Sequence, residues 1–167
     1  MDVSQIMIQM KNLILPLIST IFLFSCQPEG RVFVEHEKLS PNLEWLKKDK
    51  REFVVPVEDD TSTYKLSLSF RYANGYQFQV ARVRVTEIDP NGEQVVTNHE
   101  LIVREDNGEY IGEPGYDIWD SEHVIETNKQ YKLKGNYKYI LEHNMPTDPL
   151  HFAMEIGVIL DKVSATN

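Results

Sequence analysis

The feature that most constrains the fold is a strict alternation of large apolar and polar side chains between Tyr64 and Tyr72. Successive side chains of a strand point to opposite faces, so a period of two indicates a strand with one buried face. A helix would instead repeat its apolar positions every 3.6 residues. The apolar positions are Tyr64, Leu66, Leu68, Phe70 and Tyr72, and the polar ones are Lys65, Ser67, Ser69 and Arg71.

Turn sequences divide the following chain into more strands. Asn74-Gly75 predicts a tight turn that joins the first strand to a second, over residues 76–88, as a hairpin. A bulge near Ala81-Arg82 is expected, because the apolar side chains change parity there. Asp89-Pro90-Asn91-Gly92 is the next turn, and it leads into a strand over residues 93–103.

The C-terminal half repeats the pattern. Alternation returns over residues 131–143, and the segment 146–149, with a proline at each end, then interrupts the chain. Gly157 has the opposite parity in the last strand, which suggests a bulge or a close backbone approach. That strand should bury one face, made of Phe152, Met154, Ile156, Val158 and Leu160.

Short strands at this spacing predict an all-β fold, a single jelly-roll-like β-sandwich of about seven to nine strands. We place this domain at residues 45–163, with a tail at 164–167. Trp45 is expected to lie in the core beneath a sheet. Just before it, Ser40-Pro41 resembles a helix start and predicts one or two helical turns at most.

Leu23-Phe24-Ser25-Cys26 contains the single cysteine of the chain and follows its one long apolar run. That run, residues 12–24, is shorter than the ~20 residues that a spanning helix needs, so residues 1–25 are interpreted as a lipoprotein signal peptide whose true start can be Met10. Cys26 would then become the first residue and carry fatty-acyl chains such as palmitate. Two or more such chains give stable membrane anchoring. A plain secretory signal with an incidental cysteine is the alternative.

Residues 26–44 are expected to hold the lipidated Cys26 and a linker that begins with Gln27-Pro28-Glu29-Gly30. Gln27 is not the aspartate that retains lipoproteins in the inner membrane, so outer-membrane delivery is favoured. Because no acidic run follows Cys26, we expect the domain to face the periplasm rather than the cell surface.

The chain has a formal net charge of −9, and its basic residues are scattered among carboxylates. Nucleic-acid binding needs clustered lysine and arginine, so this class of partner is excluded. The five histidines lack the spacing of a zinc site, and no acidic cluster matches a calcium-binding loop. No nucleophile elbow and no phosphate-binding loop occur, so the sequence predicts no cofactor and no catalytic residues.

Tyr116 and Trp119 lie among carboxylates in an irregular segment, residues 109–119. Aromatic residues in loops are common contact anchors, so this pair can bind a glycan or a protein partner. Equally, the two rings can pack across the end of the sandwich. Asp117 and Asp120 beside Trp119 leave a glycosidase-like site as a third and weaker alternative.

Several segments together resemble the gliding-motility lipoprotein H (GldH) family, in order and spacing, along most of the chain after Cys26. Two differences from the family pattern are Tyr110, where tryptophan is common, and Pro146, where arginine is common. The similar segments are Trp45 with Lys48-Asp49 and Phe53, residues 64–71, Tyr76, residues 89–92, 107–112, 115–118, 135–139 and 141–145, and Glu155-Ile156-Gly157-Val158.

This resemblance implies a non-enzymatic envelope lipoprotein that acts in surface gliding with machinery linked to type IX secretion. Other gliding or secretion proteins of the envelope are then its expected partners. A glycan-binding envelope lipoprotein is the alternative function.

Overall fold

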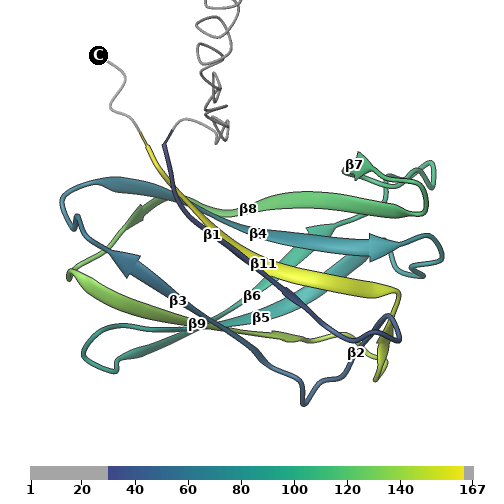
Figure 1. Cartoon of the computed structure of the whole chain (residues 1–167), viewed down its shortest axis with the longest axis horizontal. Coiled ribbons are helices and arrows are strands. Elements are labelled where there is room, and N and C mark those ends of the chain that lie inside the picture. Colours follow the sequence, from purple (N-terminus) through teal and green to yellow (C-terminus); the bar gives the residue numbers. More distant parts are fainter. Residues whose placement is uncertain (1–29, 164–167) are drawn as a thin grey trace, which may run out of the picture.

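The computed structural model of the chain describes residues 30–163, which form eleven β-strands (Figure 1). The predicted signal peptide, Cys26 and the tail lie outside the described residues. The strands are β1 (Arg31–Lys38), β2 (Glu44–Trp45), β3 (Arg51–Val57), β4 (Thr63–Ala73), β5 (Val80–Ile88), β6 (Gln94–Ile102), β7 (Glu113–Pro114), β8 (Ile118–Gln130), β9 (Gly135–His143), β10 (Leu150–His151) and β11 (Ala153–Lys162).

Two antiparallel sheets form the two layers of a sandwich. One has the strand order β1-β11-β4-β8-β7, the other has the order β3-β9-β5-β6, and β10 pairs with β2 in a small separate ladder. Without the two-residue strands β2, β7 and β10, eight long strands remain. In chain order these are β1, β3, β4, β5, β6, β8, β9 and β11. Numbered one to eight, they are arranged 1-8-3-6 in one sheet and 2-7-4-5 in the other. This is the connectivity of a double-sheet jelly roll, and it confirms the predicted fold class.

The core follows the alternation that the sequence shows. All five apolar residues predicted to line one face of β4 are at most 3% exposed, and Trp45 is fully buried. The Trp45 indole Nε1 donates a hydrogen bond to the Asp49 carbonyl oxygen at 2.7 Å, so its single polar atom is satisfied inside the core. The prediction of a buried strand and of a core tryptophan is therefore confirmed.

The buried face of β11 is shorter than predicted. Ile156, Val158 and Leu160 are buried, but Phe152 and Met154 are only partly so. A register shift between Ala153 and Glu155 explains the difference, because it gives the buried position to Ala153.

The hairpin predicted at Asn74-Gly75 is wrong. The turn is present, with the Tyr76 amide donating to the Ala73 carbonyl at 3.2 Å, but β4 and β5 belong to different sheets. Tyr76 is fully buried, and its ring lies 5.7 Å from that of Phe70 and 5.5 Å from that of Tyr72. Burial of this ring draws the chain across the core.

The predicted bulge at Ala81-Arg82 is also absent from the described β5 ladder. Its register with β6 is continuous from Val80 to Ile88, and Ala81, Val83 and Val85 share the buried parity. The parity change in the sequence instead marks the start of β5, since Phe78 precedes the strand.

The segment before Trp45 differs from expectation as well. Ser40 to Leu43 form a turn, closed by the Leu43 amide on the Ser40 carbonyl at 3.1 Å, and no helix begins there. Leu43 has a φ of 56°, outside the right-handed helical region. β1 lies within the segment assigned to the linker and pairs along β11, so the sheet begins before residue 45. Residues 30–163 contain no helix long and apolar enough to cross a membrane.

Candidate functional site

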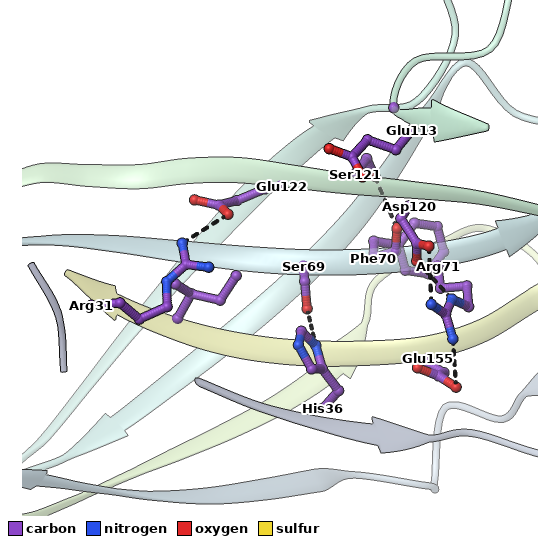
Figure 2. A pocket seen from close by; sticks show the side chains of 12 residues that line it. Arg31, His36, Ser69, Phe70, Arg71, Glu113, Asp120, Ser121, Glu122 and Glu155 are labelled. Carbon is purple, nitrogen blue, oxygen red and sulfur yellow. Dashed lines mark hydrogen bonds and ion pairs between the residues drawn. The ribbon is translucent and has the colours of Figure 1, made fainter. Parts of the chain in front are cut away.

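A concavity lies on the outer face of the five-stranded sheet, over β1, β11, β4 and β8 (Figure 2). It is a shallow groove of about 480 Å³. The alternation in β4 explains its polarity, because the parity opposite to the core places Ser69 and Arg71 on this face. We call it the outer groove and define it by Arg31, His36, Ser69, Arg71, Glu113, Asp120, Glu122 and Glu155.

The middle of the outer groove is crossed by one imidazole. His36, Gly157 and Ser69 are opposite one another on β1, β11 and β4. Since Gly157 has no side chain, the His36 ring passes over it, and Nδ1 lies 2.7 Å from Ser69 Oγ. A Cβ atom on Gly157 would come within 2.5 Å of His36 Nδ1, Ser69 Oγ and the Glu35 carbonyl oxygen. The close backbone approach predicted at this glycine is confirmed.

A network of ion pairs among Arg31, Lys65, Glu122 and Asp161 borders the groove on one side. Arg31 Nε lies 2.9 Å from Asp161 Oδ1, and Arg31 Nη2 lies 3.2 Å from Glu122 Oε2. Lys65 Nζ lies 3.0 Å from the other Asp161 oxygen. Burial opposes ionisation of Asp161, but the hydrogen bonds from Arg31 and Lys65 outweigh it and lower the pKa of the carboxyl group. These charges are therefore fixed at neutral pH.

Arg71 organises the opposite side. Its Nε and Nη2 donate to the two oxygens of Asp120 at 2.6 and 2.9 Å, and Nη1 lies 3.1 Å from Glu155 Oε1. The bidentate pair holds the guanidinium in one orientation, and the hydrogen bond to Asp120 is the main cause of the raised pKa of Arg71. Because the groove contains four carboxylates and two arginines, its lining has an excess of negative charge.

The charges and hydrogen-bonding groups of the outer groove are suited to polar recognition. A nucleophilic serine needs a histidine base whose far nitrogen is oriented by a third group, together with donors for an oxyanion. Among the hydrogen bonds of residues 30–163, none joins a carboxylate to His36 Nε2. The same residues contain no group of three or more His, Cys, Asp or Glu side chains that could hold a metal ion.

The two aromatic residues singled out in the sequence have different surroundings. Tyr116 is 99% exposed. Trp119 is only partly buried, its ring lies 5.4 Å from that of Tyr110, and its Nε1 donates to Asn74 Oδ1 at 2.9 Å. The structure thus does not bring the two rings together as one platform. Of the nearby carboxylates, Asp120 pairs with Arg71, and Asp117 accepts a hydrogen bond from Asn74 at 3.1 Å.

The outer groove was not predicted from the sequence. Its residues come from five strands, most of which are distant along the chain, so no local spacing connects them all. Two signals were nevertheless present: the polar parity of β4, and Gly157 within an otherwise apolar strand.

A family model described as GldH lipoprotein matches residues 31–160. The chain belongs to the GldH lipoprotein family. The gliding motility lipoprotein GldH of Flavobacterium johnsoniae is 31% identical over 130 residues, which cover 78% of this chain and 79% of that protein. A GldH homolog from Christiangramia forsetii is 30% identical over 129 residues, 77% of each chain. The resemblance found in the sequence is confirmed, and GldH family membership implies a membrane-anchored lipoprotein of the cell envelope.

The similarity of this chain to solved structures is weak. A family GH115 4-O-methyl-α-glucuronidase with specificity for decorated arabinogalactans matches 83% of this chain with 18% of its own, at 12% identity and a TM-score of 0.44. The similarity is too weak to support an argument about the function of the GldH chain.

Proposed function

We propose that this GldH protein is a non-enzymatic accessory or assembly component of the gliding motility and type IX secretion apparatus. It is anchored by acylated Cys26 to the outer membrane and faces the periplasm. The family match over residues 31–160 is the observation that carries the proposal, because it includes nearly all of the folded domain.

The position of β1 supports a role close to the membrane. Only four residues separate Cys26 from Arg31, the first residue of β1. Such a segment spans at most about 18 Å. Arg31 is itself held to β11 by Asp161, so the domain would be tethered through a rigid strand and not through a long linker.

The electrostatics support a non-enzymatic role. A carboxyl group that acts as a general acid near neutral pH needs a raised pKa. The carboxyl groups with a resolved shift in the described chain, Asp59, Glu142 and Asp161, all have a lowered pKa, since each has a basic hydrogen-bond partner. These groups are suited to fixed charge complementarity with a partner.

The test is deletion of the gene, followed by complementation with the wild-type protein or with Cys26→Ala. We expect the deletion strain to lose colony spreading and secretion of type IX cargo. The wild-type protein should restore both, and Cys26→Ala should restore neither and should leave the membrane fraction. Undiminished spreading and secretion in the deletion strain would overturn the proposed function.

The location has its own test, protease treatment of intact and of permeabilised cells. The periplasmic assignment requires that the protein be cleaved only after permeabilisation. Cleavage in intact cells would place it on the cell surface.

Glycan binding is the second candidate, and the nearly complete exposure of Tyr116 is the observation that favours it. Envelope polysaccharide would be incubated with the wild-type protein, with Tyr116→Ala and with a matched control, Val54→Ala, at an exposed site on β3. Retention that is lost only with Tyr116→Ala supports this candidate. No retention of polysaccharide by the wild-type protein rejects it.

A further inference from the structure

Strand β6 is an exposed edge of the four-stranded sheet. It pairs with β5 along all nine of its residues without a register shift. Its other edge carries the row of backbone N–H and C=O groups that every edge strand leaves without sheet partners. Seven of its nine residues are exposed.

The other long edges of the two sheets carry features that discourage edge-to-edge pairing, whereas β6 does not. Strand β3 contains Pro56, β1 has four charged residues among eight, and β8 has two register irregularities against β4. In β6, Glu100 is the one side chain of Asp, Glu, Lys or Arg type, and it is paired with Arg82 at 2.9 Å. The strand contains no proline and no lysine.

Apolar side chains gather on this unprotected edge. Val95 is 59% exposed and Val96 is 54% exposed, although their strand lies in the sheet that helps to bury the core. Val95 has the parity of buried Leu101, and it borders a cavity of about 80 Å³ between the sheets, together with His99 and Ile125. The inner face of β6 is thus incompletely covered in the isolated chain. An added strand would cover it.

We propose that β6 pairs with β6 of a second copy of this chain, antiparallel and centred on Asn98, so that two four-stranded sheets become one continuous sheet. Asn98 is the middle of the nine residues Gln94–Ile102, so this register pairs the strand over its full length. A two-fold axis through this point gives a closed dimer, the commonest symmetry of homo-oligomers.

The register is chemically self-compatible. It places Val95 opposite Leu101 of the partner copy and Thr97 opposite His99 on the inner face, and Val96 opposite Glu100 on the outer face. Odd-numbered residues of one β6 lie opposite odd-numbered residues of the other, so side chains on the inner face lie next to side chains on the inner face. No two like charges face each other, although the whole chain has a net charge of −9.

Cysteine cross-linking in the membrane tests this proposal, because Cys26 is the single native cysteine. Residues directly opposite in an antiparallel pair have Cα atoms about 4.5–5.5 Å apart, within the range of a disulfide. Asn98→Cys should therefore form a disulfide-linked dimer of the full-length lipoprotein under mild oxidation. The two copies of residue 100 would be about 14 Å apart, too far for a disulfide. We therefore expect Glu100→Cys alone to stay monomeric, but to cross-link when it is coexpressed with Val96→Cys.

Two substitutions of Val96, to side chains of similar size but opposite charge, test the register further. Added to Asn98→Cys, Val96→Glu faces Glu100 of the partner copy and should reduce the disulfide yield roughly two- to tenfold. Val96→Lys should retain the yield. Circular dichroism would verify that each variant is folded. The proposal would be overturned if the folded Asn98→Cys protein remained monomeric, or if Asn98→Cys and Glu100→Cys cross-linked equally well. Either result is independent of the proposed role in gliding.

Discussion

His36 on β1 reaches Ser69 on β4 across the intervening strand β11, with 2.7 Å between Nδ1 and Oγ. The two strands are not neighbours, so the contact exists only because Gly157 leaves the space between them empty. Gly157 on β11 thus allows a side chain of β1 to contact a side chain of β4 in the outer groove.

Gly157→Ala should destabilise the domain by about 1–3 kcal/mol, because the new Cβ atom overlaps the Glu35 carbonyl oxygen as well as the two side chains. Urea denaturation measures the change. The variant His36→Ala removes one exposed side-chain contact and should cost less than about 1 kcal/mol. In the double variant the backbone overlap remains, so a full recovery of stability would contradict this explanation.

The sequence predicted what local periodicity determines. The buried faces of β4 and of most of β11 follow from alternation, and the turn at Asp89-Pro90-Asn91-Gly92 follows from turn-forming residues, with the Gly92 amide donating to the Asp89 carbonyl at 3.0 Å. Such signals lie within a few residues of one another. They predicted the all-β fold class, but not all of the eleven strands.

Sheet assignment and the outer groove depend on pairing between distant residues, which local patterns do not specify. The turn at Asn74-Gly75 is compatible with a hairpin and with a crossing between sheets, and burial of Tyr76 decides for the crossing. The longest strand, β8, was not predicted at all, because most of its side chains are polar and it lacks regular alternation. Strands β1 and β8 contribute much of the groove, so the groove was missed with them.

Two buried tyrosines offer a matched pair of substitutions. The Tyr72 hydroxyl oxygen lies 2.7 Å from the Val103 carbonyl and 2.6 Å from that of Ile111, and it can donate to one of them at a time. The Tyr76 hydroxyl is buried without a hydrogen-bond partner. Tyr72→Phe should therefore lower the free energy of unfolding by about 1–3 kcal/mol, whereas Tyr76→Phe should leave it unchanged or raise it. Equal losses in the two variants would contradict the assignment of these hydrogen bonds.

Acid should destabilise the domain through His143. Its side chain is fully buried beside Trp45, neither ring nitrogen has a hydrogen-bond partner, and burial lowers its pKa. Asp148 at 3.9 Å, Lys47 and Glu142 are the charged groups that act on it. The unfolded chain then binds a proton more readily than the folded chain.

Stability contributed by neutral His143 is consequently present above the unfolded pKa, about 6.5, and is lost as the pH falls below it. We expect the free energy of unfolding, measured in urea between pH 7.5 and 5.5, to decrease towards low pH. His143→Phe should reduce that slope by up to about 1.4 kcal/mol per pH unit. His99 and His123, whose pKa values burial also lowers, would account for the slope that remains. An unchanged slope in His143→Phe would exclude this histidine as a cause.

Trp119 and Tyr116 can be separated by stability before any binding partner is known. Trp119→Ala removes a ring that packs on Tyr110 and a hydrogen bond to Asn74, so it should cost about 1–3 kcal/mol in chemical denaturation. Tyr116→Ala, at a fully solvated position, should change stability by less than about 0.5 kcal/mol. If the predicted costs are reversed, Tyr116 rather than Trp119 is structural. If the predicted costs hold, a binding defect of Tyr116→Ala indicates a direct contact with the partner. A binding defect of Trp119→Ala can instead come from lost stability, so the milder variant Trp119→Phe is needed to distinguish the two causes. Trp119→Phe keeps an aromatic ring against Tyr110 and removes the indole donor.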